Sequence, residues 1–393
     1  MNSTRLLILP SLKVKQTSDD KIIITKKFID GIIEYQRHWS GEVVVLIEPT
    51  LEPSNQLDNI SVKINELPFN LNVVNFDSIN KYQYFRKESV VLASMGFRQN
   101  HISKICKLSN IPCIYITEYS WKTRMQVIDS TTNNPALRLR RYIWEATQEL
   151  KQRQAIAIAN GVQCNGTPTY EGYRTINSNP LQYFDTRVKE NMLASNTELK
   201  ARTSQCLKNS PLRLLFSGRL IKIKGADHLI RVAQKLKNLG VEFEMFICGD
   251  GDLRELIEKE IQQSRLSDSV KMLGVLQFQT ELIPFIKKNI DIFVCCHRQG
   301  DPSCTYLETM SCGVPIVGYD NQAFAGLVKY SQAGWLVKMN QPDMLALKIA
   351  QLNENRESIV AESHKSLEFA KQHTFEKTFT RRIAHIQEIV RGK

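Results

Sequence analysis

The sequence predicts an α/β protein built from two domains, each with a doubly wound parallel sheet. Its 393 residues are enough for two domains at about 150 residues each. Apolar, strand-sized segments alternate with helix-like segments along both halves, which is typical of parallel sheets covered by helices. The hydrophobic fraction of 42% and the charged fraction of 23% are those of a core-forming chain, so disordered and coiled-coil classes are excluded.

In the first half, strands and helices alternate in the order that builds one α/β domain. Each predicted strand is a short apolar run, and each predicted helix repeats its apolar residues at helical spacing. Strands are expected over 6–10, 43–49, 90–94, 112–119 and 158–166, and helices over 28–39, 102–110 and 137–157. They predict a first domain over 1–200.

The second half repeats this alternation and predicts a second domain over 201–373. The polar stretch 195–210 has no long apolar period, so we expect the linker between the domains there. A last amphipathic helix is expected in 374–393, because apolar residues repeat at helical spacing. Strands are expected over 212–218, 242–249, 270–274, 290–296 and 313–319, and helices over 225–239 and 252–264. The apolar residues of the last helix are Phe375, Phe379, Ile383 and Ile386.

The predicted helix 137–157 has two interpretations. An apolar stripe that fits a core-facing side is formed by Leu139, Ile143, Ala146 and Leu150. Glu149 and Arg153 are spaced for an ion pair, so an ordinary surface helix is favoured. Its arginines and lysines, together with Trp144, also fit a helix that docks on a membrane surface, and this alternative stays open.

The charge and the cysteines narrow the class of protein. Lysine and arginine number 52 against 40 acidic residues, but no basic stripe with interleaved aromatic residues dominates, so no nucleic-acid partner is expected. The nine cysteines and seven histidines form no paired metal-binding spacing, so no metal is expected. No apolar run approaches the roughly 18 residues of a membrane span, and the N-terminus lacks a signal-peptide pattern, so a cytoplasmic protein is expected.

Ligands of open α/β sheets bind beyond the carboxyl ends of the strands, so we expect a ligand site at the loops that follow the strands of the second half. The first loop follows Gly218 and places Arg219 and Lys224 before an expected helix near Gly225. Fixed cations beside a helix N-terminus stabilise a diphosphate. A basic pair near a turn is also common on protein surfaces, so this signal is weak by itself.

Two further loops look functional. In CGDGDLREL, Gly249 permits a tight turn, and Asp250 or Asp252 is expected to cap the next helix. The segment HRQGDPSCTYLETMSCGVPIV reads as a loop, a helix that contains Glu308, a glycine stop and a strand.

Taken as a set, these motifs resemble the family 4 glycosyltransferases of GT-B architecture. The resemblance rests on GRL, the five-residue step from Arg219 to Lys224, KG, GDG and LETMSCGVPIV, and covers most of residues 210–345. It is looser in the first half, where NGVQCNGTPTY over 160–170 resembles the end of an acceptor domain. The resemblance implies two Rossmann-like domains that face each other across a cleft, with a last helix crossing back to the first domain.

The resemblance also implies an activity. A hexose-type sugar would pass, with retention of anomeric configuration and without a metal or cofactor, from a UDP- or GDP-linked donor to a glycan or lipid-linked acceptor in cell-surface polysaccharide biosynthesis. The second domain would bind the donor, and the first domain would bind the acceptor. Arg219 and Lys224 would act on the diphosphate, and Glu308 would accept hydrogen bonds from the ribose. The other implied donor-binding residues are Gly218, Gly249, Asp250, Gly300, Asp301, Ser303, Cys304 and Thr305.

One position departs from the family pattern. The first glutamate of the family's pair should stand eight residues before Glu308, where this chain has Gly300. The nearest carboxylate is Asp301. Either Asp301 replaces the missing group as a catalytic residue, or Asp301 and Pro302 only fix a turn.

In the first domain, Glu118 ends a predicted strand, and the resemblance implies a catalytic, acceptor-side residue there. Tyr119, Arg124 and the loop 11–15 are further candidates for the cleft by position. Among second-domain residues near the loops, His228 is expected to be structural. His297 and Arg298 have two interpretations, as site residues or as structural residues.

Three hypotheses of function follow. The leading one is the retaining glycosyltransferase. The second, motivated by Gly300, is a catalytically inactive nucleotide-sugar-binding or assembly subunit, and the third is a nucleotide-sugar epimerase on the same architecture. If the protein is the retaining glycosyltransferase, its basic surface is also consistent with a location at the inner face of the cytoplasmic membrane.

Overall fold

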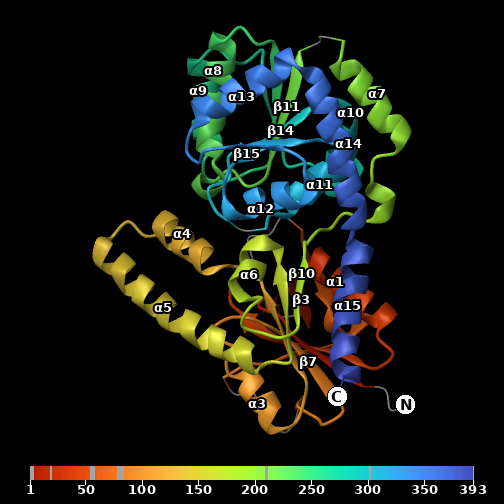
Figure 1. The fold of residues 1–393 in the computed structure, drawn as a ribbon. Coiled ribbons are helices and arrows are strands. Elements are labelled where there is room, and N and C mark those ends of the chain that lie inside the picture. The colour runs from red at the N-terminus through yellow and green to blue at the C-terminus, as the bar shows by residue number, and fades with distance from the viewer. Residues whose placement is uncertain are drawn as a thin grey trace.

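The computed structural model describes residues 4–17, 20–53, 58–77, 84–208, 211–300 and 302–392. They form two α/β domains, drawn one above the other in Figure 1 with the first domain below. The chain enters the second domain after β10 (Pro180–Tyr183) and returns between α14 (Arg356–Gln372) and α15 (Phe375–Arg391). The predicted two-domain fold with a last helix that crosses back is confirmed.

A mostly parallel sheet forms the centre of the first domain. Its strands run in the order β10-β9-β8-β7-β1-β4, and β6 also pairs with β4. The strands β2, β3 and β5 extend this sheet, with β3 antiparallel to both neighbours. β2 and β5 contain few apolar residues, whereas β3 has the apolar run Ile22–Ile24, which was not predicted to be a strand. The strands are β1 (Arg5–Leu9), β2 (Lys13–Gln16), β3 (Lys21–Thr25), β4 (Val43–Thr50), β5 (Asn59–Lys63), β6 (Asn70–Val73), β7 (Ser89–Ser94), β8 (Cys113–Thr117), β9 (Gly161–Asn165) and β10.

Helices cover both faces of the first sheet. In β1, Leu6 and Ile8 pack into one apolar cluster, and Leu7 and Leu9 pack into another on the opposite face, because side chains alternate along a strand. The helices begin at clear signals: the side chain of Asn134, for example, accepts hydrogen bonds from two backbone N–H groups of the first turn of α5. The helices are α1 (Lys26–His38), α3 (Ile102–Leu108), α4 (Trp121–Thr131), α5 (Pro135–Ile158) and α6 (Gly166–Tyr173), with a 3₁₀ turn at Ile64–Glu66.

The second domain contains a six-stranded parallel sheet in the order β13-β12-β11-β14-β15-β16. Helices pack on both faces, over two large apolar clusters. The strands are β11 (Leu212–Ser217), β12 (Phe243–Cys248), β13 (Val270–Gly274), β14 (Ile292–Cys295), β15 (Ile316–Tyr319) and β16 (Trp335–Val337). The helices are α7 (Asn196–Cys206), α8 (Leu229–Asn238), α9 (Arg254–Gln263), α10 (Ile283–Asn289), α11 (Cys304–Ser311), α12 (Gln322–Ser331), α13 (Pro342–Glu354) and α14.

The stretch 195–210, expected to be a linker, contains an ordered helix, so that prediction was wrong. Ser195 and Glu198 form a reciprocal capping box at the start of α7. The guanidinium of Arg202 is buried and donates to the carbonyl oxygens of Ile290, at 2.6 Å, and of Gly313. The buried face of α7 mixes Leu199 and Cys206 with Arg202 and Thr203, so it has no long apolar stripe, which is why periodicity missed it.

The last helix, α15, completes the core of the first domain. Phe375, Phe379, Ile383 and Ile386 are all buried in the cluster that also contains residues of β1 and α1. The rings of Phe379 and Tyr35 pack edge to face with centroids 5.2 Å apart. The predicted apolar stripe of this helix is confirmed.

The structure corrects the assignment of faces on α5. The stripe of Leu139, Ile143, Ala146 and Leu150 is exposed rather than packed in the core. The buried face instead carries polar side chains such as Gln148, Glu149 and Gln152. The predicted ion pair between Glu149 and Arg153 is present at 2.7 Å.

Candidate functional site

The strand order of the second sheet reverses at β11, whose neighbours are β12 on one side and β14 on the other. Connections that leave such a reversal on opposite sides of the sheet open a crevice beyond the carboxyl ends of the strands. The loops after β11, β12 and β14 start at this edge. They contain most of the predicted donor-binding residues.

The loops after β11 and β12 pack backbone against backbone. Gly249 has φ of +128°, and a Cβ atom there would lie 1.9 Å from the carbonyl oxygen of Gly218. The N–H of Gly218 donates to the carbonyl of Cys248 at 3.0 Å, and that of Leu220 donates to the carbonyl of Asp250 at 2.9 Å. The predicted donor residues Gly218, Gly249 and Asp250 therefore share one tight corner.

The loop after β11 is also fixed against the end of β14. Gly225 has φ of +70°, and a Cβ atom there would lie 2.0 Å from the carbonyl oxygen of Cys296. Lys224, just before it, is 8% exposed, whereas Arg219 at the start of the loop is exposed. Two 3₁₀ turns precede α8, so the regular helix begins at Leu229, later than expected.

Two histidines, His228 and His297, lie near this loop. His228 Nδ1 lies 2.8 Å from the hydroxyl of Tyr319. Arg298 is paired with Asp227 at 2.7 Å and ties the loop after β14 to the turn before α8. His297 is 1% exposed, and burial together with the charge of Lys224 holds its pKa well below the usual value.

The capping role expected for Asp250 or Asp252 is not observed. The N-cap of α9 is Leu253, and no side chain caps this helix. The carboxylate of Asp250 instead accepts from the N–H of Gly251 at 2.9 Å and lies 3.7 Å from Arg254.

Helix α11 carries the predicted ribose-binding carboxylate. Glu308 is 5% exposed, and its Oε1 accepts a hydrogen bond from Arg187 Nε at 2.7 Å. The guanidinium of Arg187 lies over the ring of Phe278, 3.8 Å from its centroid. Arg187 comes from the chain segment between the domains, so no local motif of the sequence could connect it with Glu308.

The first turn of α11 contacts the first domain. Ser303 is the N-cap, and Cys304 and Thr305 open the helix. Lys27 of α1 pairs with Asp185 and lies 3.0 Å from Cys304 Sγ. Burial lowers the pKa of Lys27, but Asp185 and Cys304 outweigh that effect and the net shift is upward, so the ammonium stays charged. Lys27 is a second functional candidate that the sequence did not reveal.

The loop that contains Gly300 also meets the first domain. The N–H of Gly300 donates to Gln126 Oε1 of α4 at 2.9 Å. A Cβ atom on Gly166 would lie 2.7 Å from Cβ of Pro302, so the backbone of Gly166 packs closely against the ring of Pro302. Asp301 lies outside the described residues, and its catalytic role stays a prediction.

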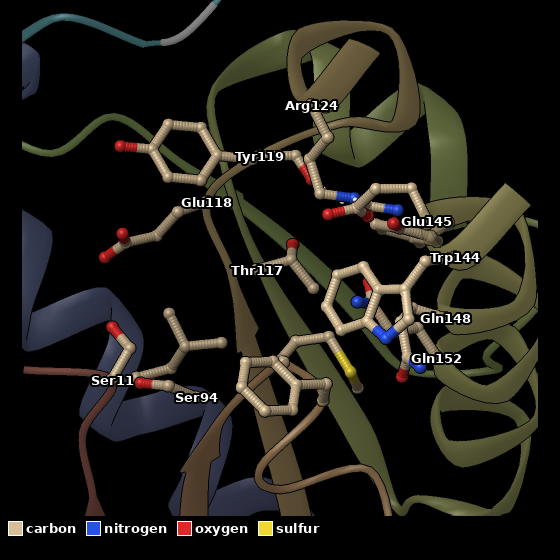
Figure 2. A pocket seen from close by; sticks show the side chains of 15 residues that line it. Ser11, Ser94, Thr117, Glu118, Tyr119, Arg124, Trp144, Glu145, Gln148 and Gln152 are labelled. Carbon is tan, nitrogen blue, oxygen red and sulfur yellow. Dashed lines mark hydrogen bonds and ion pairs between the residues drawn. The ribbon is translucent and has the colours of Figure 1, made fainter. Parts of the chain in front are cut away.

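A cavity of about 170 Å³ lies in the first domain, at the carboxyl ends of β7 and β8 and beside α5. This edge is again a reversal of strand order, because β4 and β7 flank β1. Figure 2 shows Glu118 and Tyr119 on one side of the cavity, and the side chains of α5 with the Arg124 side chain beside Glu145 on the other. Among its lining residues are Ser11, Ser94, Phe97, Thr117, Trp144, Glu145, Gln148 and Gln152. The cleft candidates Glu118, Tyr119, Arg124 and Ser11 are thus brought together.

An ion-pair network supports one wall of this cavity. Arg124 pairs with Glu145 at 2.9 Å and also with Glu149. Tyr173 donates to Glu149 at 3.1 Å, and burial raises the pKa of Tyr173 to about 12, so its phenol stays protonated. The arginine is therefore held in place, and polar residues of α5 are buried because they face this network and the cavity.

Residues 199–371 match the family model described as Glycosyl transferases group 1. Among curated proteins, the chain is 28% identical over 158 residues to amylovoran biosynthesis glycosyltransferase AmsK of Erwinia amylovora, covering 39% of this chain and 38% of AmsK. It is 27% identical over 151 residues to the putative colanic acid biosynthesis glycosyltransferase WcaL of Escherichia coli K12, covering 37% of each chain. These matches span less than half the length of either relative.

Among solved structures, the fold is similar to Anabaena Alr3699/HepE in complex with UDP, with a TM-score of 0.65, 15% identity, and coverage of 98% of this chain and 99% of HepE. It is also similar to WaaG, a glycosyltransferase involved in lipopolysaccharide biosynthesis, with a TM-score of 0.59, 12% identity, and coverage of 97% and 99%. The fold is of the GT-B type. The similarities are to family 4-like glycosyltransferases, and the glycosyl transferases group 1 match covers less than half of the chain.

In the ranges that the structure describes, no group of three or more His, Cys, Asp and Glu side chains is placed to hold a metal ion. Within the same ranges, no helix combines the length and the apolar character needed to cross a bilayer.

Proposed function

We propose that the protein transfers a hexose-type sugar, with retention of configuration, from a nucleoside diphosphate sugar to a glycan or lipid-linked acceptor in polysaccharide biosynthesis. The observation that carries the proposal is the pairing of two sites. In the second domain Lys224 and Glu308 are both buried, in the loop after β11 and in α11, and the first domain has a polar and aromatic cavity at its own strand ends. Helix α4 connects them, because Arg124 lines the cavity while Gln126 holds Gly300.

Charge is the basis of the proposed donor role. When the sugar leaves, negative charge develops on the diphosphate, and a cation that is already fixed in place stabilises this charge without reorganisation. Lys224 meets this requirement because it is buried and its loop is locked by Gly225. Arg219 is exposed and would reach the diphosphate from the solvent side. In this proposal no metal is needed for charge stabilisation.

Glu308 would bind the ribose of the donor. A carboxylate can accept several hydrogen bonds, and Arg187 uses Oε1. In the proposal the ribose hydroxyls donate to the remaining acceptor sites of this carboxylate, while the hydrogen bond from Arg187 keeps the carboxylate oriented. Asp301 would take the place of the family's first glutamate, next to the transferred sugar.

Uridine is the base that we propose for the donor, because HepE, which shares the fold, has been solved in complexes with UDP and UDP-glucose. Thermal unfolding with UDP, GDP, ADP and their hexose conjugates tests this choice. A ligand at about 100 times its Kd adds roughly 2.7 kcal/mol of stability, and we expect such a shift with UDP and UDP-hexose only. If no nucleotide shifts the unfolding temperature, the proposed donor site is wrong.

The replacement of the first glutamate by Gly300 favours one alternative, a binding subunit without activity. The two hypotheses differ after donor binding has been established. Incubation of UDP-hexose with glycan and lipid-linked acceptors should release UDP and give a glycosylated product if the protein is a transferase. Binding without turnover, even after Gly300→Glu, would support the subunit instead.

The cavity of the first domain is proposed to hold the accepting sugar. Trp144 and Phe97 line it with rings 5.4 Å apart, and Gln148 and Thr117 supply hydrogen-bonding groups that suit hydroxyls. Because Trp144 is 43% exposed, it can be replaced with little effect on the core. Trp144→Ala should raise the acceptor KM about tenfold, through loss of an aromatic contact, and leave the UDP-induced thermal shift unchanged. Trp144→Phe is the control and should retain most of the affinity; equal KM values for all three proteins would exclude the cavity as the acceptor site.

A further inference from the structure

The outward face of α5 is apolar along its length. Leu139, Ile143 and Leu150 are 60%, 60% and 64% exposed, and Ala146 lies between them on the same face. We call these four residues the outer stripe. Residues in a helix are about 100° apart, which places the outer stripe roughly opposite Gln148 and Gln152, the residues that face the cavity. The stripe is therefore not an extension of the core or of the acceptor site.

The charges of α5 are divided between its faces. Its carboxylates are Glu145 and Glu149, and both pair with Arg124; Glu149 also pairs with Arg153 at 2.7 Å. Arg140 and Lys151 are exposed and lie on one side of the outer stripe by helical spacing, and Arg153 lies on the other. The outward face thus combines an apolar stripe with flanking cations and carries no carboxylate of its own.

The position of α5 at the side of the first domain allows its outward face to contact a flat surface such as a membrane. Figure 1 shows α4 and α5 as a helical hairpin at the side of the first domain, with α5 outermost and running 24 residues from Pro135 to Ile158. A long exposed helix can contact a flat surface along its whole length, without a complementary groove on that surface. Its narrow apolar stripe between cations is the pattern of helices that lie in the interface of a lipid bilayer.

We propose that the outward face of α5 docks the protein on a membrane surface that contains anionic lipids. The outer stripe would enter the boundary between headgroups and acyl chains, and Arg140 and Lys151 would lie at the level of the anionic headgroups. A second copy of the chain is a poorer occupant, because a symmetric contact between two such faces brings cations opposite cations. This inference concerns location and does not depend on transferase activity.

Co-sedimentation with vesicles tests the proposal on the full chain. We expect at least about tenfold stronger binding to vesicles of phosphatidylcholine mixed with phosphatidylglycerol than to phosphatidylcholine alone, with most of the difference lost at high salt. The triple variant Leu139→Ser, Ile143→Ser, Leu150→Ser and the double variant Arg140→Glu, Lys151→Glu should each lose about tenfold in binding. Neither should change the thermal shift given by UDP, because all five side chains are exposed and far from the crevice.

A matched variant controls for the general loss of exposed apolar surface. Leu239, Leu256 and Leu336 of the second domain are 40%, 44% and 41% exposed, and their replacement by serine should leave vesicle binding unchanged. Equal binding of wild type and the α5 triple variant, or equal binding to neutral and anionic vesicles, would overturn the proposal. A concentration-dependent dimer that the triple variant abolishes, without vesicle binding, would assign the face to a second copy instead.

Discussion

Replacing Lys224 with alanine is expected to lower kcat/KM for the nucleotide sugar by about 100- to 1000-fold. This is the typical cost of removing one group that stabilises charge developing in a transition state. The effect should be large because Lys224 is 8% exposed, so little water is present to replace its charge. Initial rates of UDP release in the presence of acceptor measure it.

Lys222 offers a matched control two residues away in the same 3₁₀ turn. Its side chain is exposed, and its contribution to the loop is a backbone carbonyl that accepts from Arg298. Lys222→Ala should therefore stay within about twofold of wild type, since an exposed charge is screened by water. If the two alanine variants lose the same activity, Lys224 has no special role at the diphosphate.

Asp291→Ala is expected to destabilise the protein by about 3–5 kcal/mol, the usual cost of removing one partner from a buried ion pair. Asp291 is 1% exposed and Arg213 8%, and the carboxylate accepts from Arg213 Nε at 3.0 Å and Nη2 at 2.7 Å. Burial lowers the pKa of nearby Arg202 to about 10, and the Asp291 carboxylate opposes that shift. The variant would leave two buried guanidinium groups without this counter-charge.

Urea unfolding followed by circular dichroism measures the change through the midpoint and slope. Asp343→Ala is the control: its pair with Arg231 also has a 2.7 Å contact, but the two side chains are 45% and 62% exposed. Exposed pairs contribute below about 1 kcal/mol, so this variant should unfold close to wild type. Similar losses for both variants would show that burial is not what makes the Asp291 pair important.

The central strands were predictable because they are mostly apolar and buried, and the bounds of β11 and β7 differ from prediction by one residue at an end. The edge strand Val270–Gly274, which is only partly buried, was predicted with its observed bounds. The face of α5 was not predictable. Periodicity assigns the apolar side of a helix to the core. In α5, however, Glu149 pairs with Arg124 and Gln148 lines the cavity, so the polar side faces the domain and the apolar side is exposed.

The residues of the candidate site were likewise predictable only in part. Lys224, Gly249 and Glu308 could be found because local motifs contain them. Arg187 and Lys27 could not, because each comes from a distant segment and meets α11 only after the two domains are in contact. Such partners are fixed by tertiary structure, and no spacing in the sequence encodes them.

The return of α15 to the first domain affects how the chain acquires its structure during synthesis. A ribosome releases the first sheet long before it makes Phe375, Phe379, Ile383 and Ile386, which belong to the core against that sheet. The first domain therefore cannot complete its core until α15 has been synthesised, and part of its apolar surface stays exposed to solvent until then. Although the second domain is made later, it can finish folding first, and the first domain is the one exposed to aggregation and to chaperones in the interval.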